Sequence, residues 1–233
     1  LGLSYKSIDL HDKAIKSFIK VLQIEPKNLN SYLLIGNIYS KLRNFESAKY
    51  YYKQGLKLNP DEFLLLNGLG NVYHNENKYE EAIKSFKSSL KFVPDNAGIL
   101  NNLGNSLVAV SKFDEAINNY CKAISKDPNT KEFHLNLAFA YFYSGNYTAG
   151  WKEYEHRTEH KQLNEIEIWK GQSLKPKEKL LIYSEEGLGD TIQFLRYAIY
   201  LKSKGVDFRL CIQEKLFTLV EQTSLKSNLL DTN

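Results

Sequence analysis

The segment LGNVYHNENKYEEAIKSFKSSLKFVP, residues 69–94, decides the fold because its pattern recurs along the chain. A glycine, an alanine, an aromatic residue and a proline stand at fixed distances within it, and each recurs every 34 residues. The recurring residues are Gly2, Gly36, Gly70 and Gly104, Ala14, Ala48, Ala82 and Ala116, Phe18, Tyr52, Phe86 and Tyr120, and Pro26, Pro60, Pro94 and Pro128. A fixed period of this length is typical of stacked helical hairpins, none of which buries its apolar face alone.

The spacing within one unit predicts two antiparallel helices. Apolar residues recur at helical intervals over residues 33–39 and again over residues 48–58. We expect the small glycine and alanine to lie where the two helices approach each other, and the aromatic residue to pack against the next hairpin. The proline falls where one helix ends, because proline cannot continue a helix interior.

These units resemble the tetratricopeptide repeat family. The resemblance implies a mainly α-helical chain, a right-handed α-solenoid of about five hairpins. The repeats are expected at about residues 1–28, 29–62, 63–96, 97–130 and 131–157. The first copy starts in mid-repeat, so we expect a fragment in which the first helix of that copy is largely missing. The fifth copy has Gly150 in place of the alanine and lacks the closing proline, so we expect the solenoid to end there.

Composition excludes several classes of function. Of the 31 basic residues only four are arginines, and the lysines are interspersed with acidic residues, so a net charge of +4 does not indicate a nucleic-acid partner. The sequence contains no long uncharged apolar run, so no membrane span is predicted. Cys121 and Cys211 lie far apart with no C-x-x-C motif, which favours two buried thiols in a reducing cytoplasm. The oligomeric state is left open.

After Arg157 the repeat pattern ends, and we interpret residues 158–178 as a linker. From Lys179 the pattern predicts a strand, a helix and a second strand, followed by a further helix. These elements are expected at residues 180–183, 191–204, 206–212 and 214–222. Strand, helix and strand in this order form a βαβ unit, so residues 179–233 are expected to begin a partial α/β, Rossmann-like domain.

A glycine-rich turn, Gly187-Leu-Gly189-Asp190, joins the predicted strand and helix. Such a turn can present helix N–H groups to an anion or a hydroxyl group. The dinucleotide fingerprint would need a third glycine at Ile192, and the lysine of a P-loop is missing. The structural alternative is that Asp190 caps the helix, with Gln193 completing a capping box.

The segment KLLIYSEEGLGDTIQFLRYAIYLKSKG, residues 179–205, is similar to bacterial proteins in which tetratricopeptide repeats precede a domain of glycosyltransferase family 9, the heptosyltransferases. Other residues that carry the resemblance are Trp151, Tyr154, Arg157, Trp169 and Gly171. The resemblance implies two Rossmann-like halves, with Gly187 and Gly189 shaping the turn and Asp190 as general base on the acceptor hydroxyl. A sugar nucleotide would bind a C-terminal half that this chain lacks. We therefore expect a non-catalytic scaffold without a cofactor. The alternative is a sugar-nucleotide-dependent glycosyltransferase whose repeats select the acceptor.

Asparagines recur within the predicted first helix of successive repeats, on the face that lines the groove of such a solenoid, and we call this set the asparagine ladder. The ladder comprises Asn37, Asn67, Asn71, Asn101, Asn102, Asn105 and Asn136. Side-chain amides both donate and accept hydrogen bonds, so the ladder can hold the backbone of an extended protein or peptide partner. It resembles the asparagine-lined groove of O-linked N-acetylglucosamine transferases. The alternative is structural, because asparagine after the repeat glycine is common in the family without a known ligand.

One motif has the spacing of a metal site. Residues 156–160 read H-x-x-E-H, and two histidines four apart can share a helix face and bind zinc. No later helix offers a convincing third carboxylate, so we predict no metal site. His11, His74 and His134 fall in separate repeats and are not expected to cluster.

Overall fold

The computed structural model describes residues 2–157, 174, 178–184 and 187–230, with side chains from Leu10 onward. The chain divides into two compact units, Leu1–Glu159 and His160–Asn233. The linker predicted at residues 158–178 lies almost entirely outside the described residues, as do Trp169 and Gly171. Over the described residues, no helix combines the length and the apolar character needed to cross a membrane.

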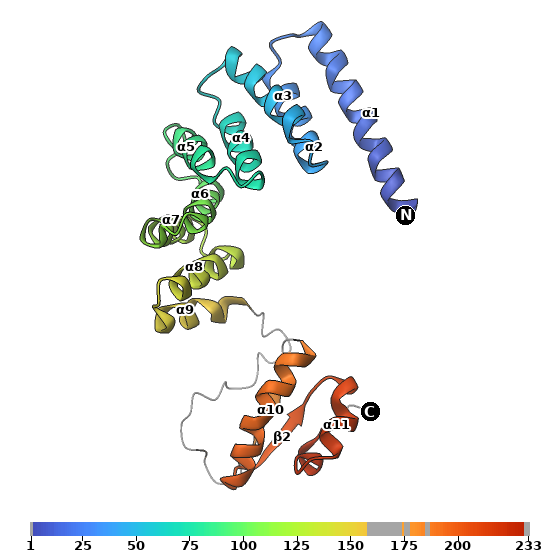
Figure 1. The fold of residues 1–233 in the computed structure, drawn as a ribbon, viewed down its shortest axis with the longest axis vertical. Helices are drawn as coiled ribbons and strands as arrows, with labels where there is room; N and C mark the ends of the chain where they lie inside the picture. The colour runs from blue at the N-terminus through green and yellow to red at the C-terminus, as the bar shows by residue number, and fades with distance from the viewer. Residues whose placement is uncertain (1, 158–173, 175–177, 185–186, 231–233) are drawn as a thin grey trace. The chain divides into compact units, whose positions relative to one another are not determined.

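The first unit is a series of helices whose neighbours in sequence pack against one another (Figure 1). The helices are α1 (Gly2–Ile24), α2 (Leu29–Lys41), α3 (Phe45–Leu58), α4 (Phe63–Asn75), α5 (Tyr79–Leu90), α6 (Ala97–Ala109), α7 (Phe113–Lys126), α8 (Lys131–Tyr143) and α9 (Tyr147–Tyr154), with a 3₁₀ turn, η1 (Glu155–Arg157), after the last. The pairs α2–α3, α4–α5, α6–α7 and α8–α9 are the predicted hairpins. Residues 1–28 are predicted to be a truncated copy whose first helix is largely missing, and in the structure α1 runs through this copy as one continuous helix.

Asparagine side chains start several of these helices. The amide oxygens of Asn28, Asn44, Asn96 and Asn146 each accept a hydrogen bond from the backbone N–H three residues later, at the first turns of α2, α3, α6 and α9. Each such cap satisfies one of the N–H groups that a helix leaves unpaired at its start. At these four helices a local side-chain contact thus sets where the helix begins.

The recurring aromatic residue is the centre of each repeat's core. Tyr52, Phe86 and Tyr120 are each 1% exposed. A Cβ atom added at Gly36 would lie 2.4 Å from Cε1 of Tyr52, and Gly70 and Gly104 stand in the same relation to the rings of their own repeats. The glycine thus makes room for the ring sixteen residues later, rather than for the facing alanine as the sequence interpretation had it. This contact fixes how close the two helices of a hairpin lie.

The second unit contains a short parallel sheet. Strands β1 (Leu180–Tyr183) and β2 (Phe208–Cys211) pair in parallel, with Leu180 opposite Phe208, and α10 (Leu188–Ser203) connects them. A further bridge joins Leu210 to Leu229, also in parallel. Beyond β2 lie η2 (Glu214–Leu216), α11 (Phe217–Glu221) and η3 (Lys226–Asn228). Phe208 and Leu210 of β2 are buried, whereas β1 is only half-buried.

Candidate functional site

The first helices of the hairpins form one continuous face. Helix α2 contacts α4, α4 contacts α6, and α6 contacts α8 (Figure 1). In a curved stack, the helices that touch their equivalents in the next repeat are those on the inner side. The predicted asparagine ladder lies on these four helices.

A hollow of about 390 Å³ opens on this face between α2 and α4. It is lined by Asn37, Ser40, Lys41, Tyr52, Asn71, His74 and Asn75. Two members of the predicted ladder, Asn37 and Asn71, thus share one polar depression. Its lining supplies amides, two hydroxyls, an imidazole and one ammonium group, and no carboxylate.

Two ladder amides are held in place by buried tyrosines. The hydroxyl of Tyr52 donates to Oδ1 of Asn37 at 2.7 Å, and that of Tyr120 donates to Oδ1 of Asn105 at the same distance. Burial raises the pKa of both tyrosines, so the hydroxyls stay protonated and remain donors. The tyrosine hydroxyl uses one of the two lone pairs of the amide oxygen and fixes the orientation of the amide, so the N–H₂ group of Asn37 and Asn105 is the part left wholly available to a ligand.

Asn71 differs from its equivalents because the third repeat has Phe86 at the aromatic position. Phenylalanine has no hydroxyl, and Asn71 has no side-chain hydrogen bond among the described residues. Its amide is half-buried and lies in the hollow. Asn71 therefore offers both a donor and an acceptor to a ligand.

Two pairs of ladder residues bond to each other. Nδ2 of Asn102 donates to Oδ1 of Asn67 at 3.4 Å, and Nδ2 of Asn136 donates to Oδ1 of Asn101 at 2.9 Å. Asn101 is 2% exposed and also donates to Glu132 at 3.4 Å. The prediction that Asn101 lines the groove is therefore wrong: this buried amide joins α6 to α8.

The sequence interpretation missed His74 as a residue of the hollow. Its Nδ1 lies 2.9 Å from Oγ of Ser106, and that hydroxyl donates to the carbonyl of Asn102 at 3.2 Å. Since the single hydroxyl proton is used there, Nδ1 of His74 is the donor and Nε2 keeps a free lone pair. Burial lowers the pKa of His74, which favours this neutral form. Its separation of 32 residues from Ser106 is close to the repeat period, and this is the one sequence signal that could have suggested the contact.

The glycine turn of the second unit is arranged differently from either sequence interpretation. Helix α10 already begins at Leu188, with Gly187 as the N-cap, so Gly189 and Asp190 belong to its first turn. Among the described residues of this turn no side-chain capping hydrogen bond forms, so the capping box predicted for Asp190 and Gln193 is not seen there. Neither glycine has a positive φ, and a Cβ at Gly189 would meet nothing within 4 Å. The structure leaves the role of Asp190 as general base a prediction.

One histidine has a partner that the sequence did not suggest, and the cysteines are less buried than predicted. His134 of the fifth repeat lies against His156, a pairing that the sequence interpretation did not consider. Glu159 and His160 of the H-x-x-E-H motif lie outside the described residues. Cys121 is exposed rather than buried, and Cys211 is half-buried; both are free thiols.

The helical unit matches several models of one family. Models described as "TPR repeat" or "Tetratricopeptide repeat" match residues 70–110, 104–145, 30–62, 51–84 and 1–28. The chain therefore contains tetratricopeptide repeats, and the predicted repeat fold is confirmed. No curated protein sequence matches the chain, and no family match supports the resemblance to glycosyltransferase family 9.

Solved structures of the protein MamA share the fold. A crystal structure of MamA has a TM-score of 0.59 and 22% identity, covering 67% of this chain and 91% of MamA. MamA from Desulfovibrio magneticus RS-1 has a TM-score of 0.59 and 17% identity, covering 66% and 88%. A further MamA structure has a TM-score of 0.59 and 21% identity, covering 72% and 94%. At these sequence identities the comparison shows a shared helical repeat fold and nothing more specific.

Proposed function

We propose that the repeat array is a scaffold that binds an extended segment of a partner protein along the face formed by α2, α4 and α6. The observation that carries the proposal is the polar hollow between α2 and α4, in which Asn71 has an uncommitted amide. A cytoplasmic location fits the free thiols of Cys121 and Cys211.

The groups in the hollow suit a peptide backbone. The amide N–H₂ of Asn37 can donate to a peptide carbonyl, while Nε2 of His74 can accept from a peptide N–H. Asn71 can do both. An extended peptide presents carbonyl and N–H groups alternately along its length, so it matches a row of fixed donors and acceptors with little demand on its side chains. Lys41 adds a positive charge, which favours a partner segment that carries an acidic side chain.

The proposal can be tested by selecting binders from a random peptide library displayed on phage, and measuring the selected peptides by calorimetry. The variant Asn37→Ala/Asn71→Ala should bind them at least about fivefold more weakly, the effect of losing about 1 kcal/mol of hydrogen bonding. Asn118→Ala is the matched control. Asn118 is an exposed asparagine on α7, which is the second helix of its hairpin and does not form the proposed binding face. Equal affinities for the wild type and the double variant would refute the groove as the binding site.

A second candidate function rests on the parallel pairing of β1 and β2 across α10. Parallel strands joined by a helix are built into larger sheets with both faces covered, and nucleotide-binding domains are one such class. On this proposal the unit beginning at β1 belongs to a sugar-nucleotide-dependent transferase, with Asp190 as its base and the repeats choosing the acceptor. The present chain should release no nucleoside diphosphate from a panel of sugar nucleotides. Release that is abolished by Asp190→Ala would instead show that this chain is itself the enzyme.

A further inference from the structure

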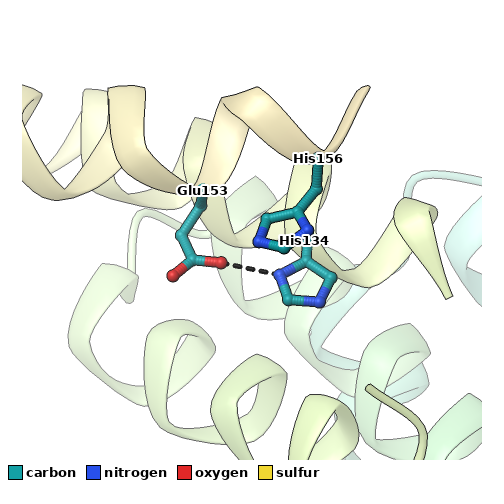
Figure 2. A group of neighbouring side chains, drawn as sticks. All are labelled: His134, Glu153 and His156. Carbon is teal, nitrogen blue, oxygen red and sulfur yellow. Dashed lines mark hydrogen bonds and ion pairs between the residues drawn. The ribbon is translucent and has the colours of Figure 1, made fainter. Parts of the chain in front are cut away.

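Three side chains at the last hairpin converge on one point (Figure 2). His134 comes from α8, Glu153 from α9 and His156 from η1. Each offers one nitrogen or oxygen, and these atoms all lie within 4.8 Å of one another. Nδ1 of His134 is 2.7 Å from Oε2 of Glu153, and the two imidazole rings stack with centroids 3.8 Å apart.

The repeat pattern does not account for this cluster. One period earlier, the positions of His134, Glu153 and His156 are held by a leucine, an asparagine and a lysine, Leu100, Asn119 and Lys122. The packing of a hairpin therefore needs neither the imidazoles nor the carboxylate. The three residues occur together in the fifth repeat, and in none of the earlier ones.

One nitrogen of His134 does have a role in the fold. Its Nε2 lies 3.0 Å from the carbonyl oxygen of Pro128, and a carbonyl can only accept, so Nε2 carries a proton. In the first full repeat the hydroxyl of Tyr32, at the equivalent position, donates to the carbonyl of Pro26 at 3.1 Å. The contact with the proline carbonyl is thus shared between repeats, and what is particular to His134 is its second nitrogen, Nδ1, aimed at Glu153.

This is the arrangement in which histidine binds metal ions. Metal-bound imidazoles usually donate their other N–H to a carbonyl or carboxylate, which fixes the tautomer and the ring orientation. We propose that His134 Nδ1, Glu153 and His156 form a binding site for a divalent transition-metal ion such as Zn²⁺. On binding, the ion replaces the proton that His134 shares with Glu153, and that proton is released to solvent. The imidazole lone pair and the ionised carboxylate become ligands.

The geometry allows this with small movements. A tetrahedral zinc ion with bonds of about 2.0–2.1 Å needs ligand atoms about 3.3 Å apart. The separations between the ligand atoms, none of them above 4.8 Å, must close by at most about 1.5 Å. Rotation of His156 can supply it because this side chain is exposed, whereas His134 is 7% exposed and stays fixed. Two imidazoles and one carboxylate suit zinc and its neighbours and leave a position for water, while magnesium and calcium prefer oxygen ligands.

A metal ion here would tie α9 and η1 to α8. The last repeat of an array has no following repeat to hold it, so a terminal unit needs its own means of stabilisation. The site would therefore stabilise the end of the repeat array without contributing to the groove.

The test is a calorimetric titration of ZnCl₂ into the chain, with MgCl₂ as the comparison ion. We expect one zinc ion per chain, no saturable magnesium binding, and a higher midpoint of thermal unfolding with zinc. His156→Ala and Glu153→Gln should each weaken zinc binding at least about tenfold, since each removes a ligand. Glu155→Gln, which alters an exposed carboxylate between the two ligands, should bind zinc as the wild type does. Absence of saturable zinc binding, or wild-type affinity in either ligand variant, would overturn the proposal. Circular dichroism of each variant checks that the helices are intact.

Discussion

Alanine in place of Gly68 should destabilise the repeat array, although alanine is the better helix former. The added Cβ would lie 2.7 Å from Cζ of Tyr52, 2.8 Å from Cε1 and 3.0 Å from the hydroxyl oxygen. These distances are about 1 Å shorter than normal contacts between such atoms. The ring cannot retreat, because a Cβ at Gly36 would also lie only 2.4 Å from Cε1. Tyr52 is therefore confined between the backbones of α2 and α4.

The size of the effect follows from three contributions. Overpacking a core costs about 1–3 kcal/mol, and a confined ring points to the upper half of that range. The gain in helix propensity from glycine to alanine returns about 1 kcal/mol. Displacing the ring also weakens the hydrogen bond from Tyr52 to Asn37, a bond worth about 1 kcal/mol. We expect a net loss of about 2 kcal/mol, or a thermal midpoint lower by about 4–8 °C.

Thermal unfolding followed by circular dichroism measures this loss, with Gly98→Ala as the matched control. Gly98 also lies in a helix, but its added Cβ would meet nothing closer than the Asn96 side chain at 3.5 Å. That variant should be unchanged or slightly more stable. In a Tyr52→Ala background the clash is gone, so Gly68→Ala should then cost little, and the two substitutions should be strongly non-additive. A Gly68→Ala variant as stable as the wild type would refute the confinement argument.

Four further predictions concern polar groups of the array. Lys49→Ala should cost about 1–3 kcal/mol in urea unfolding, because the carboxylate of Glu76, 2.8 Å from Lys49 Nζ, is left without its main partner; an unchanged midpoint would contradict this. Burial acts to raise the pKa of Glu76, but hydrogen bonds from Lys49 lower it overall. The stabilisation from this ion pair should therefore be lost as the pH falls below about 4.5. Over the same pH range the free energy of unfolding of Lys49→Ala should fall less than that of the wild type. Burial lowers the pKa of His74, so the unfolded chain takes up the proton first; stability should fall as the pH drops below about 6.5, and less so in His74→Gln, as unfolding measured from pH 7.5 to 5 would show. Phe86→Tyr should stabilise the array by about 1 kcal/mol by giving Asn71 the hydroxyl partner that its equivalents have, and a less stable variant would show that Asn71 cannot reach it.

The sequence predicted the repeats well because the information for each hairpin is local. The 34-residue period identifies equivalent residues, and the capping asparagines and prolines mark where helices begin and end. The period does not say which of the recurring residues touch. Gly36 was expected to face Ala48, but it faces the ring of Tyr52, because the ring is large enough to span the space between the two helices. The sequence pattern predicts a helix start at residue 191, three residues later than Leu188, because a pair of glycines is typical of a turn; in the structure neither glycine has a positive φ.

The cluster at the last hairpin could not be predicted for a related reason. His134 and Glu153 are 19 residues apart and on different helices, so their contact depends on how α8 and α9 are turned toward each other. The H-x-x-E-H motif pairs His156 with His160, four residues later on the same predicted helix. The structure pairs His156 with a residue on a neighbouring helix instead, which no short motif describes.

The ladder shows that equivalent residues of a repeat need not do equivalent work. Asn37, Asn71 and Asn105 follow the repeat glycine in three successive units, yet the buried residue behind each determines what its amide can offer. Tyrosine behind Asn37 and Asn105 uses one lone pair of the amide oxygen and leaves the donor free, whereas phenylalanine behind Asn71 leaves the donor and both lone pairs. A single hydroxyl in the core thus sets the hydrogen-bonding character of the groove one layer away. Phe86→Tyr separates the two consequences: it should raise stability and, by using one lone pair of the Asn71 oxygen and fixing the amide, lower affinity for a peptide that donates to that oxygen.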